Sequence, residues 1–136
     1  MKPTKLKPER KKQNLSQNSS ANYKIIPTDI FIAEAKKLAK KYPNIKNDFF
    51  QLQKALRKDP ITGNDFLGKD CYKVRMAISD KNSGQSGGAR VIIEVKIINR
   101  KVYVLSVYDK SEKGNMFDKE LERILKKRLL QFPPDK

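Results

Sequence analysis

The stretch Tyr72-Lys-Val-Arg-Met-Ala-Ile-Ser79 decides the fold, because large apolar side chains occupy every second position along it. Successive side chains of a β-strand lie on opposite faces of the sheet, so this spacing predicts a strand with one apolar face. If Val74 and Met76 pack against a hydrophobic core, Lys73 and Arg75 both lie on the open face. The stretch therefore predicts a half-open sheet that carries a pair of cations.

Upstream of this stretch, apolar residues recur at the spacing of amphipathic helices. They predict one helix over about 29–42, capped by Thr28 or Asp29, and a second over about 45–58, with Asn44 as a possible cap. The connection between the two helices is so short that they must run antiparallel. The N-terminal half therefore predicts a helical hairpin.

The remaining elements are bounded by glycine, asparagine or proline. They are a short strand over residues 23–26, a loop with three glycines over 80–88, strands over 90–97 and 101–108, and a helix over 118–130. Strands joined by hairpins, with helices outside them, indicate an α+β domain. We expect a small antiparallel β-sheet packed against an N-terminal helical hairpin, with a C-terminal helix.

The charge of the chain favours a polyanionic partner. Its 136 residues include 31 Lys and Arg against 15 Asp and Glu, a formal net charge of +16. Residues 1–22 contribute six basic residues and one acidic residue, so +11 belongs to the rest of the chain. Binding to nucleic acid would release counterions and weaken steeply with salt. A solvated basic surface without a specific partner is the alternative.

The sequence divides into a basic arm and one domain. Residues 1–22 are rich in Lys, Pro, Asn, Ser and Gln and nearly free of apolar side chains, so we expect a flexible arm. We expect this arm to be passive, with a tether to RNA or the ribosome as the alternative. Residues 23–132 form the expected domain. No apolar run is long enough for a membrane span or a secretory signal, so we expect a cytoplasmic protein.

The residue types present exclude several kinds of site. The chain has no histidine and a single cysteine, Cys71, so a histidine-based triad, a disulfide framework and a zinc cluster are all excluded. The loop over 83–88 lacks the ending of a nucleotide-binding P-loop and joins strand to strand, which favours a flexible connection. We expect neither a metal nor a cofactor.

Cations gather at the ends of the predicted strands. Arg90 opens its strand directly after two glycines, whose missing side chains let another backbone or a ligand approach closely. Tyr108 and Lys110 end the last strand, and Lys113 follows one step later. We expect Asp109 to act mainly as an ion-pair partner that orients the lysines beside it, and Glu112 to do the same. Convergence on strand ends is what a functional site requires.

Three segments together carry a family resemblance. They are Cys71-Tyr-Lys-Val-Arg75, Gly88-Ala-Arg-Val-Ile92 and Val104-Leu-Ser-Val-Tyr-Asp-Lys-Ser-Glu-Lys113. In this order after a helical hairpin, they resemble the RelE/ParE toxin superfamily, and more closely its RelE and HigB-like ribonuclease branch of type II toxin–antitoxin systems. The likeness covers about residues 23–130. The family fold, a small antiparallel sheet holding a helical hairpin, agrees with the fold that the periodicities predict.

The resemblance implies an endoribonuclease toxin. Members of this branch cut mRNA, often at the ribosome, by attack of a ribose 2′-hydroxyl on the adjacent phosphate, and no metal is implied. By position, Lys73 and Arg75 match the basic pair of the family, Arg90 matches the arginine that opens the next strand, and Lys110 falls where a further arginine is usual. The implied partners are mRNA, the ribosome and a cognate antitoxin encoded by a neighbouring gene.

The expected site has five catalytic candidates. Lys73 would take the 2′-proton, while Arg75 and Arg90 would stabilise charge on the phosphoryl oxygens with their planar guanidinium groups. Tyr108 or Lys110 would protonate the leaving 5′-oxygen, or Tyr108 would stack on a base. The candidate RNA-binding residues are Lys69, Lys81, Lys113 and Phe117.

One departure from the family and two alternatives bear on this interpretation. The tyrosine often present in the C-terminal segment of these toxins has no counterpart near Met116 and Phe117, and Phe117 can stack but cannot transfer a proton. One alternative is a ParE-like toxin that binds DNA gyrase, because fold does not determine function. The other is a basic protein that binds RNA or the ribosome without cleaving.

Overall fold

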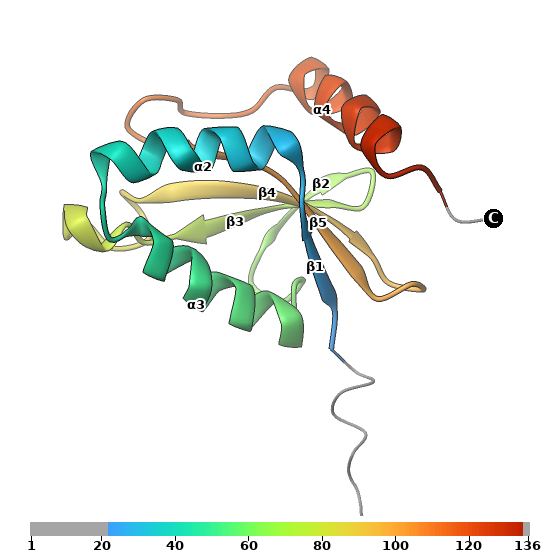
Figure 1. Ribbon diagram of the computed structural model, residues 1–136, viewed down its shortest axis with the longest axis horizontal. Coiled ribbons are helices and arrows are strands. Elements are labelled where there is room, and N and C mark those ends of the chain that lie inside the picture. Colours follow the sequence, from blue (N-terminus) through green and yellow to red (C-terminus); the bar gives the residue numbers. More distant parts are fainter. Residues whose placement is uncertain (1–21, 135–136) are drawn as a thin grey trace, which may run out of the picture.

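The computed structural model describes residues 22–134, so the predicted arm lies outside the described residues except for Asn22. The elements follow one another as a strand, a helical hairpin, four strands and a last helix (Figure 1). They are β1 (Lys24–Pro27), α2 (Asp29–Lys41), α3 (Ile45–Lys58), β2 (Asp65–Gly68), β3 (Cys71–Met76), the short 3-10 helix η1 (Ser79–Lys81), β4 (Ala89–Lys96), β5 (Lys101–Asp109) and α4 (Asp118–Gln131).

The five strands form one sheet in the order β1-β5-β4-β3-β2. The pairs β2–β3, β3–β4 and β4–β5 are antiparallel, whereas β1 runs parallel to β5. The predicted α+β class and its mostly antiparallel sheet are confirmed. The parallel pairing of β1 with β5 needs a long crossover, which the helices and strands between them in the chain supply.

The helical hairpin packs on one face of the sheet. Val74 and Met76 of β3 are buried in a cluster that includes Leu38 of α2 and Leu56 of α3. This packing is the one that the alternation over residues 72–79 required, and it leaves the other face of β3 for its cations. At the turn of the hairpin, Asn44 lies at the N-cap of α3, but its side chain binds Asp80 instead of capping the helix.

The N-terminal part of α2 covers the edge of β5 beyond the end of β1. Thr28 caps α2, and its hydroxyl also donates to the carbonyl oxygen of Val104 at 2.9 Å. Glu34 accepts from the amide of Val107 at 3.1 Å and from the hydroxyl of Ser106 at 2.7 Å, next to a register shift in the β4–β5 pairing. The helix therefore satisfies the strand edge that β1 is too short to reach.

Helix α4 packs on the opposite face of the sheet. Leu121 and Ile124 are buried against Ile92 and Leu105. A buried ion pair anchors the C-terminal half of the helix: the Arg128 guanidinium donates to both carboxylate oxygens of Glu94, at 2.7 and 3.0 Å. The same guanidinium lies 4.3 Å from the centre of the Tyr103 ring. Helix α4 therefore covers one part of the face that carries the cations.

The sequence prediction missed one strand. β2 has only four residues and lies at the sheet edge, where it joins β3 through a turn in which Lys69 and Asp70 have φ of 53° and 63°. These angles suit a tight hairpin turn, which Asn-Gly or Asp-Gly usually signals. Lys69-Asp70 lacks that signal. The predicted strand over 72–79 also ends earlier, at Met76, and gives way to η1.

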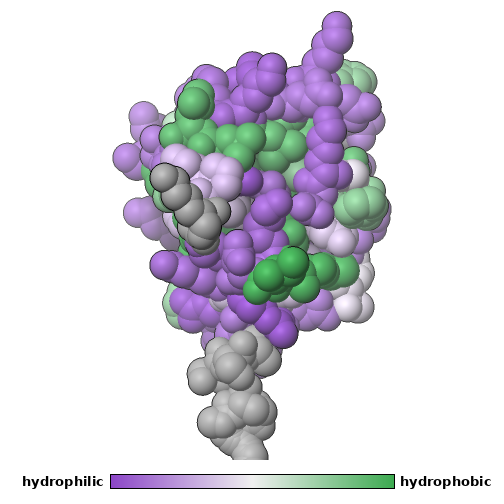
Figure 2. Space-filling view, turned by 90° about the vertical axis from the view of Figure 1, so that its right-hand side faces the viewer, coloured by the Kyte–Doolittle hydropathy of each residue, from purple (hydrophilic) through white to green (hydrophobic). Residues whose placement is uncertain are grey.

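The end of the molecule that holds the β4–β5 turn has a mainly hydrophilic surface with separate apolar patches (Figure 2). The most exposed large apolar side chains of the described residues include Ile98, 96% exposed in that turn, and Leu130, 82% exposed in α4. Within residues 22–134, none of the helices has the length and apolar character of a membrane span.

Candidate functional site

A row of candidate residues crosses three neighbouring strands. Arg75 of β3 lies opposite Arg90 of β4, and Arg90 lies opposite Tyr108 of β5. Residues directly opposite in antiparallel strands project to the same face, and Lys73 shares it because it lies two residues from Arg75. The sheet therefore brings four of the five predicted catalytic residues onto the face that α4 partly covers. We call Lys73, Arg75, Arg90 and Tyr108 the cation row.

The β3 end of the row is open to solvent. The Arg75 side chain is 54% exposed, and its only ion pair within residues 22–134 is a long contact of 3.5 Å with Asp65 of β2. Lys73 is half-buried and makes no ion pair or side-chain hydrogen bond with any described residue. Both cations are therefore available to an anion on this face.

Arg90 occupies a different environment. It is only 4% exposed, and its guanidinium donates to the backbone carbonyl oxygens of Gln85, Ser86 and Ala89 at 2.8 to 3.1 Å. These bonds tie the glycine-rich loop to the start of β4. Gly88 completes the junction, because a Cβ atom there would lie 2.2 Å from the carbonyl oxygen of Met76. The close approach expected beside Arg90 is thus that of the protein's own backbone.

Tyr108 is buried beneath the segment that follows β5. Its side chain is 7% exposed, and its hydroxyl has no hydrogen-bond partner among residues 22–134. Burial raises the pKa of this phenol above 10.0, so it keeps its proton at neutral pH. Lys113 lies 5.2 Å above the ring and pairs with Glu120 of α4. Lys110 is exposed, with its backbone amide bonded to the carbonyl oxygen of Gly88 at 3.0 Å.

Asp109 projects to the other face and joins three parts of the chain. Its carboxylate accepts from the Tyr42 hydroxyl at 2.7 Å, the Lys81 ammonium at 2.9 Å, and the amide and hydroxyl of Ser111 at 2.9 and 2.7 Å. Burial opposes ionisation of this carboxyl, but these hydrogen bonds outweigh it and hold its pKa well below 3.8. Asp109 therefore links α2, η1 and the turn after β5.

Two expectations about ion pairs were wrong. Asp109 pairs with Lys81 rather than Lys110, and Glu112 pairs with Lys41 of α2 at 2.9 Å rather than with Lys113. Sequence neighbours cannot reveal these pairs, because the partners lie on helices and turns that only the tertiary fold brings to the end of β5.

All three predicted RNA-binding cations are in ion pairs. The Lys81 side chain is 18% exposed and held by Asp109, while Lys69 pairs with Glu122 of α4 at 2.7 Å. Phe117, in contrast, is 75% exposed. It lines a hollow whose other walls include Lys73, and we call it the Phe117 hollow. No sequence pattern signals this hollow, because its walls come from β2, β3, β4 and the segment that leads into α4.

The described residues offer no obvious metal site. Between residues 22 and 134, no three carboxylate, thiol or imidazole side chains gather in a way that could hold a metal ion. Cys71 is fully buried, and burial raises the pKa of its thiol to about 12. The thiol is therefore neutral at physiological pH, and we assign it a packing role against α4.

Comparison with known proteins supports a toxin fold. Residues 50–132 match the family model described as the RelE toxin of the RelE/RelB toxin–antitoxin system. A double arginine-to-alanine mutant of E. coli toxin RelE, in the free state, has a similar structure. Its TM-score is 0.51, with 18% sequence identity over 82% of this chain and 98% of that one. At this identity the likeness concerns the fold.

A second solved structure is less similar. The RelBE2 toxin–antitoxin complex of Mycobacterium tuberculosis contains a chain with a TM-score of 0.49 and 15% identity, over 65% of this chain and 92% of that one. None of the curated proteins matches the chain in sequence.

Proposed function

This chain belongs to the RelE toxin family, and we propose that it is an endoribonuclease that inhibits translation by cleaving translated mRNA at the open end of its cation row. The observation that supports this most is the position of Lys73 and Arg75. Both lie on the sheet face opposite the helical hairpin, and no close ion pair among residues 22–134 neutralises either one. Neighbouring cations with so little pairing suit a phosphodiester.

The proposed reaction is a transesterification within RNA. In its neutral amine form, Lys73 takes the proton of a ribose 2′-hydroxyl and becomes an ammonium. The oxygen of that hydroxyl attacks the adjacent phosphorus while the bond from phosphorus to the 5′-oxygen breaks. A proton from the protein reaches that oxygen, so the products are a 2′,3′-cyclic phosphate and a free 5′-hydroxyl. We assign the proton to Lys110 because it is exposed, whereas the hydroxyl of Tyr108 is buried.

The two arginines have different roles in this proposal. Arg75 contacts the phosphoryl oxygens directly, because its guanidinium is exposed and its one ion pair with the described residues is long. Arg90 adds positive potential from below and holds the loop that borders the row, because its donors are already bound to carbonyl oxygens. Tyr108 has a packing role in this proposal, because it is buried in the cluster beneath α4.

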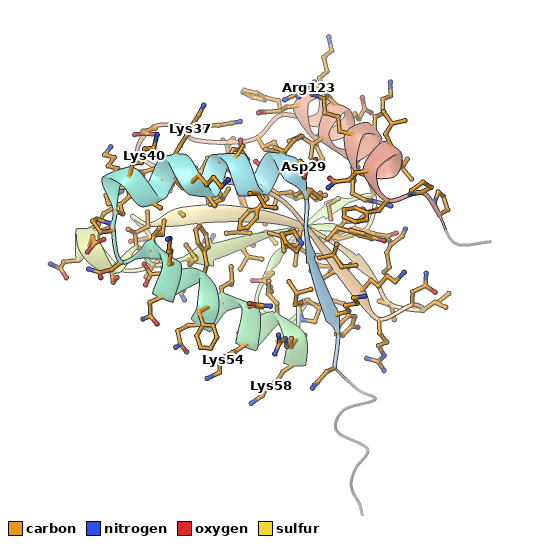
Figure 3. The ribbon with its side chains drawn as sticks, viewed as in Figure 1. Asp29, Lys37, Lys40, Lys54, Lys58 and Arg123 are labelled. Carbon is orange, nitrogen blue, oxygen red and sulfur yellow. The ribbon has the colours of Figure 1, made fainter. Side chains whose placement is uncertain are left out.

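The test replaces Lys73 and Arg75 together by alanine and measures cleavage of a translated message by primer extension. We expect the cleavage rate to fall by at least about a hundredfold, as is usual when a transition-state donor is lost. The matched control replaces Lys54 and Lys58, which project from α3 away from the sheet (Figure 3). The control removes the same charge and should cleave normally.

Two results would contradict the proposal. Undiminished cleavage by the Lys73 and Arg75 double variant would show that these residues are not the active site. If the wild type binds RNA but produces no new RNA ends, the protein is a non-catalytic RNA-binding protein. Growth arrest that begins with DNA damage rather than a block of protein synthesis would favour a gyrase-binding toxin instead.

We also propose a cognate antitoxin as the protein partner. The family is defined by toxin–antitoxin pairs, and α2 and α3 border an apolar groove that a partner helix can fill. The groove has an apolar lining and a basic rim, which comprise Phe31, Ala35, Phe49, Lys36, Lys40 and Lys46. An amphipathic helix with acidic flanks would complement both.

The antitoxin proposal has a direct genetic test. A short open reading frame beside this gene should encode a protein that relieves growth arrest when both are expressed, and that copurifies with the toxin. Absence of such a reading frame, or failure of its product to bind, would contradict this part of the proposal.

A further inference from the structure

We propose that the Phe117 hollow binds one base of the RNA and favours bases that carry an exocyclic amino group. This inference rests on the proposed RNA substrate and adds to it a site for base recognition. The hollow adjoins the open end of the cation row, because Lys73 belongs to both. A phosphate held by Lys73 and Arg75 would therefore place a neighbouring base at the hollow.

The walls of the hollow suit the flat, apolar faces of a base. Leu67 and Met116, which are partly exposed, supply apolar surface above the buried Ile92, and the Phe117 ring is 75% exposed at the entrance. A large aromatic side chain so exposed contributes little to the core. Stacking of bases on such rings is the usual way in which proteins hold single-stranded RNA.

The polar side of the hollow suits the edge of a base. Asn115 and Asp118 line it, both are exposed, and the side chain of neither makes a hydrogen bond or ion pair with any residue in the described part of the chain. The Asp118 carboxylate can only accept hydrogen bonds, so it complements the amino groups of adenine, cytosine and guanine. Uracil has no amino group, and its one donor on the Watson–Crick edge, N3–H, lies between two carbonyl oxygens that the carboxylate repels.

The experiment measures binding without cleavage. Short RNAs are 2′-O-methylated so that no 2′-hydroxyl can attack, and each carries 2-aminopurine at a single position. We expect quenching at one position when the full-length protein binds at low salt, because stacking on Phe117 quenches this base. F117A should weaken binding about tenfold and remove the quenching. F50A, which removes an aromatic ring 56% exposed on α3, is the matched control and should leave both unchanged.

Specificity is tested with D118N. RNAs that differ only by adenosine or uridine at the quenched position should differ in affinity by about tenfold for the wild type. The amide of D118N can both donate and accept, so the preference should shrink to about twofold or less. D29N removes the same charge at the first residue of α2 and should keep the preference. Circular dichroism shows whether each variant is folded.

The outcomes separate this inference from the proposed cleavage. No position-specific quenching, or unchanged binding and base preference in F117A and D118N, overturns the base site even if cleavage depends on Lys73. If the wild type stacks on a base at one position but cuts no message, the base site is supported and the proposed ribonuclease activity is contradicted. If F117A binds RNA normally but no longer binds the antitoxin, the hollow is a protein-binding surface and the inference is wrong.

Discussion

The two ends of the cation row contain similar residues in opposite environments. At the β3 end, Arg75 is half-exposed and Lys73 has no ion pair with the described residues; at the β5 end, Arg90 and Tyr108 are buried, and Asp109 beside them is fully enclosed. The difference follows from what covers each strand. The glycine-rich loop binds Arg90, the segment after β5 lies over Tyr108 and α2 covers the edge of β5, whereas β3 has only the short β2 beside it. The covered β5 end, which we call the inner end, stabilises the fold. The exposed β3 end, which we call the outer end, is free to bind a ligand.

The largest effect should come from Asp109→Ala at the inner end. The substitution leaves the Lys81 ammonium and the Tyr42 hydroxyl without their acceptor, and loss of one partner of a buried ion pair costs about 3–5 kcal/mol. The measurement is chemical denaturation. Glu112→Ala removes an exposed carboxylate from the same turn and is the control, expected to change the free energy of unfolding far less. Equal effects would mean that burial of Asp109 has no special importance.

The second effect is a loss of stability in acid. Because the pKa of Asp109 is lower in the folded protein than the unfolded value of 3.8, its ionised form stabilises the fold above that pH, and the stabilisation is lost as the pH falls toward the folded pKa. The difference in unfolding free energy between wild type and D109N should therefore be constant near neutral pH and shrink below about pH 4. A difference that stays constant down to about pH 2 would contradict the assigned ionisation.

The third effect concerns the loop. Arg90→Met removes the donors to Gln85 and Ser86 and should cost about 1–3 kcal/mol. Amide hydrogen exchange of residues 83–88 should accelerate in this variant. Arg57→Met, an exposed substitution on α3, should leave that exchange unchanged. If the loop exchanges at the same rate in both variants, Arg90 does not hold it.

The smallest effect on stability should appear at the outer end. Replacing Lys73 and Arg75 by alanine should change the free energy of unfolding by no more than about 0.5 kcal/mol, because neither side chain is fully buried or closely paired within residues 22–134. The same variant should bind RNA with a shallower dependence on salt than the wild type. A large loss of stability here would show that both ends of the row are structural.

The fold was largely predictable because its signals are local. The alternation over residues 72–79 and the helical spacing around Phe31 and Phe49 specify which faces are apolar, and these faces did pack together. β2 was missed because it is short and because Lys69 and Asp70, the two residues of its turn, include no glycine. The parallel pairing of β1 with β5 brings together residues that are far apart in the sequence, such as Lys24 and Lys101. No local pattern can signal such a pairing.

The candidate site was predictable only as a set of residues. The sequence predicted that Arg75, Arg90 and Tyr108 gather at strand ends, and the register places them side by side on one face. Their exposure differs because it depends on what covers each strand. Lys81 was expected to bind RNA, but its partner Asp109 lies 28 positions away in sequence, at the end of β5.

The sequence by itself determined the charge of this protein, the faces of its helices and strands, and the residue types available for chemistry, because these depend on composition and on spacings of two or about 3.6 residues. Only the tertiary structure decided which cations are free. Burial and pairing depend on residues distant in the chain, and they commit Arg90 and Lys81 to the fold while leaving Lys73 and Arg75 open to a ligand.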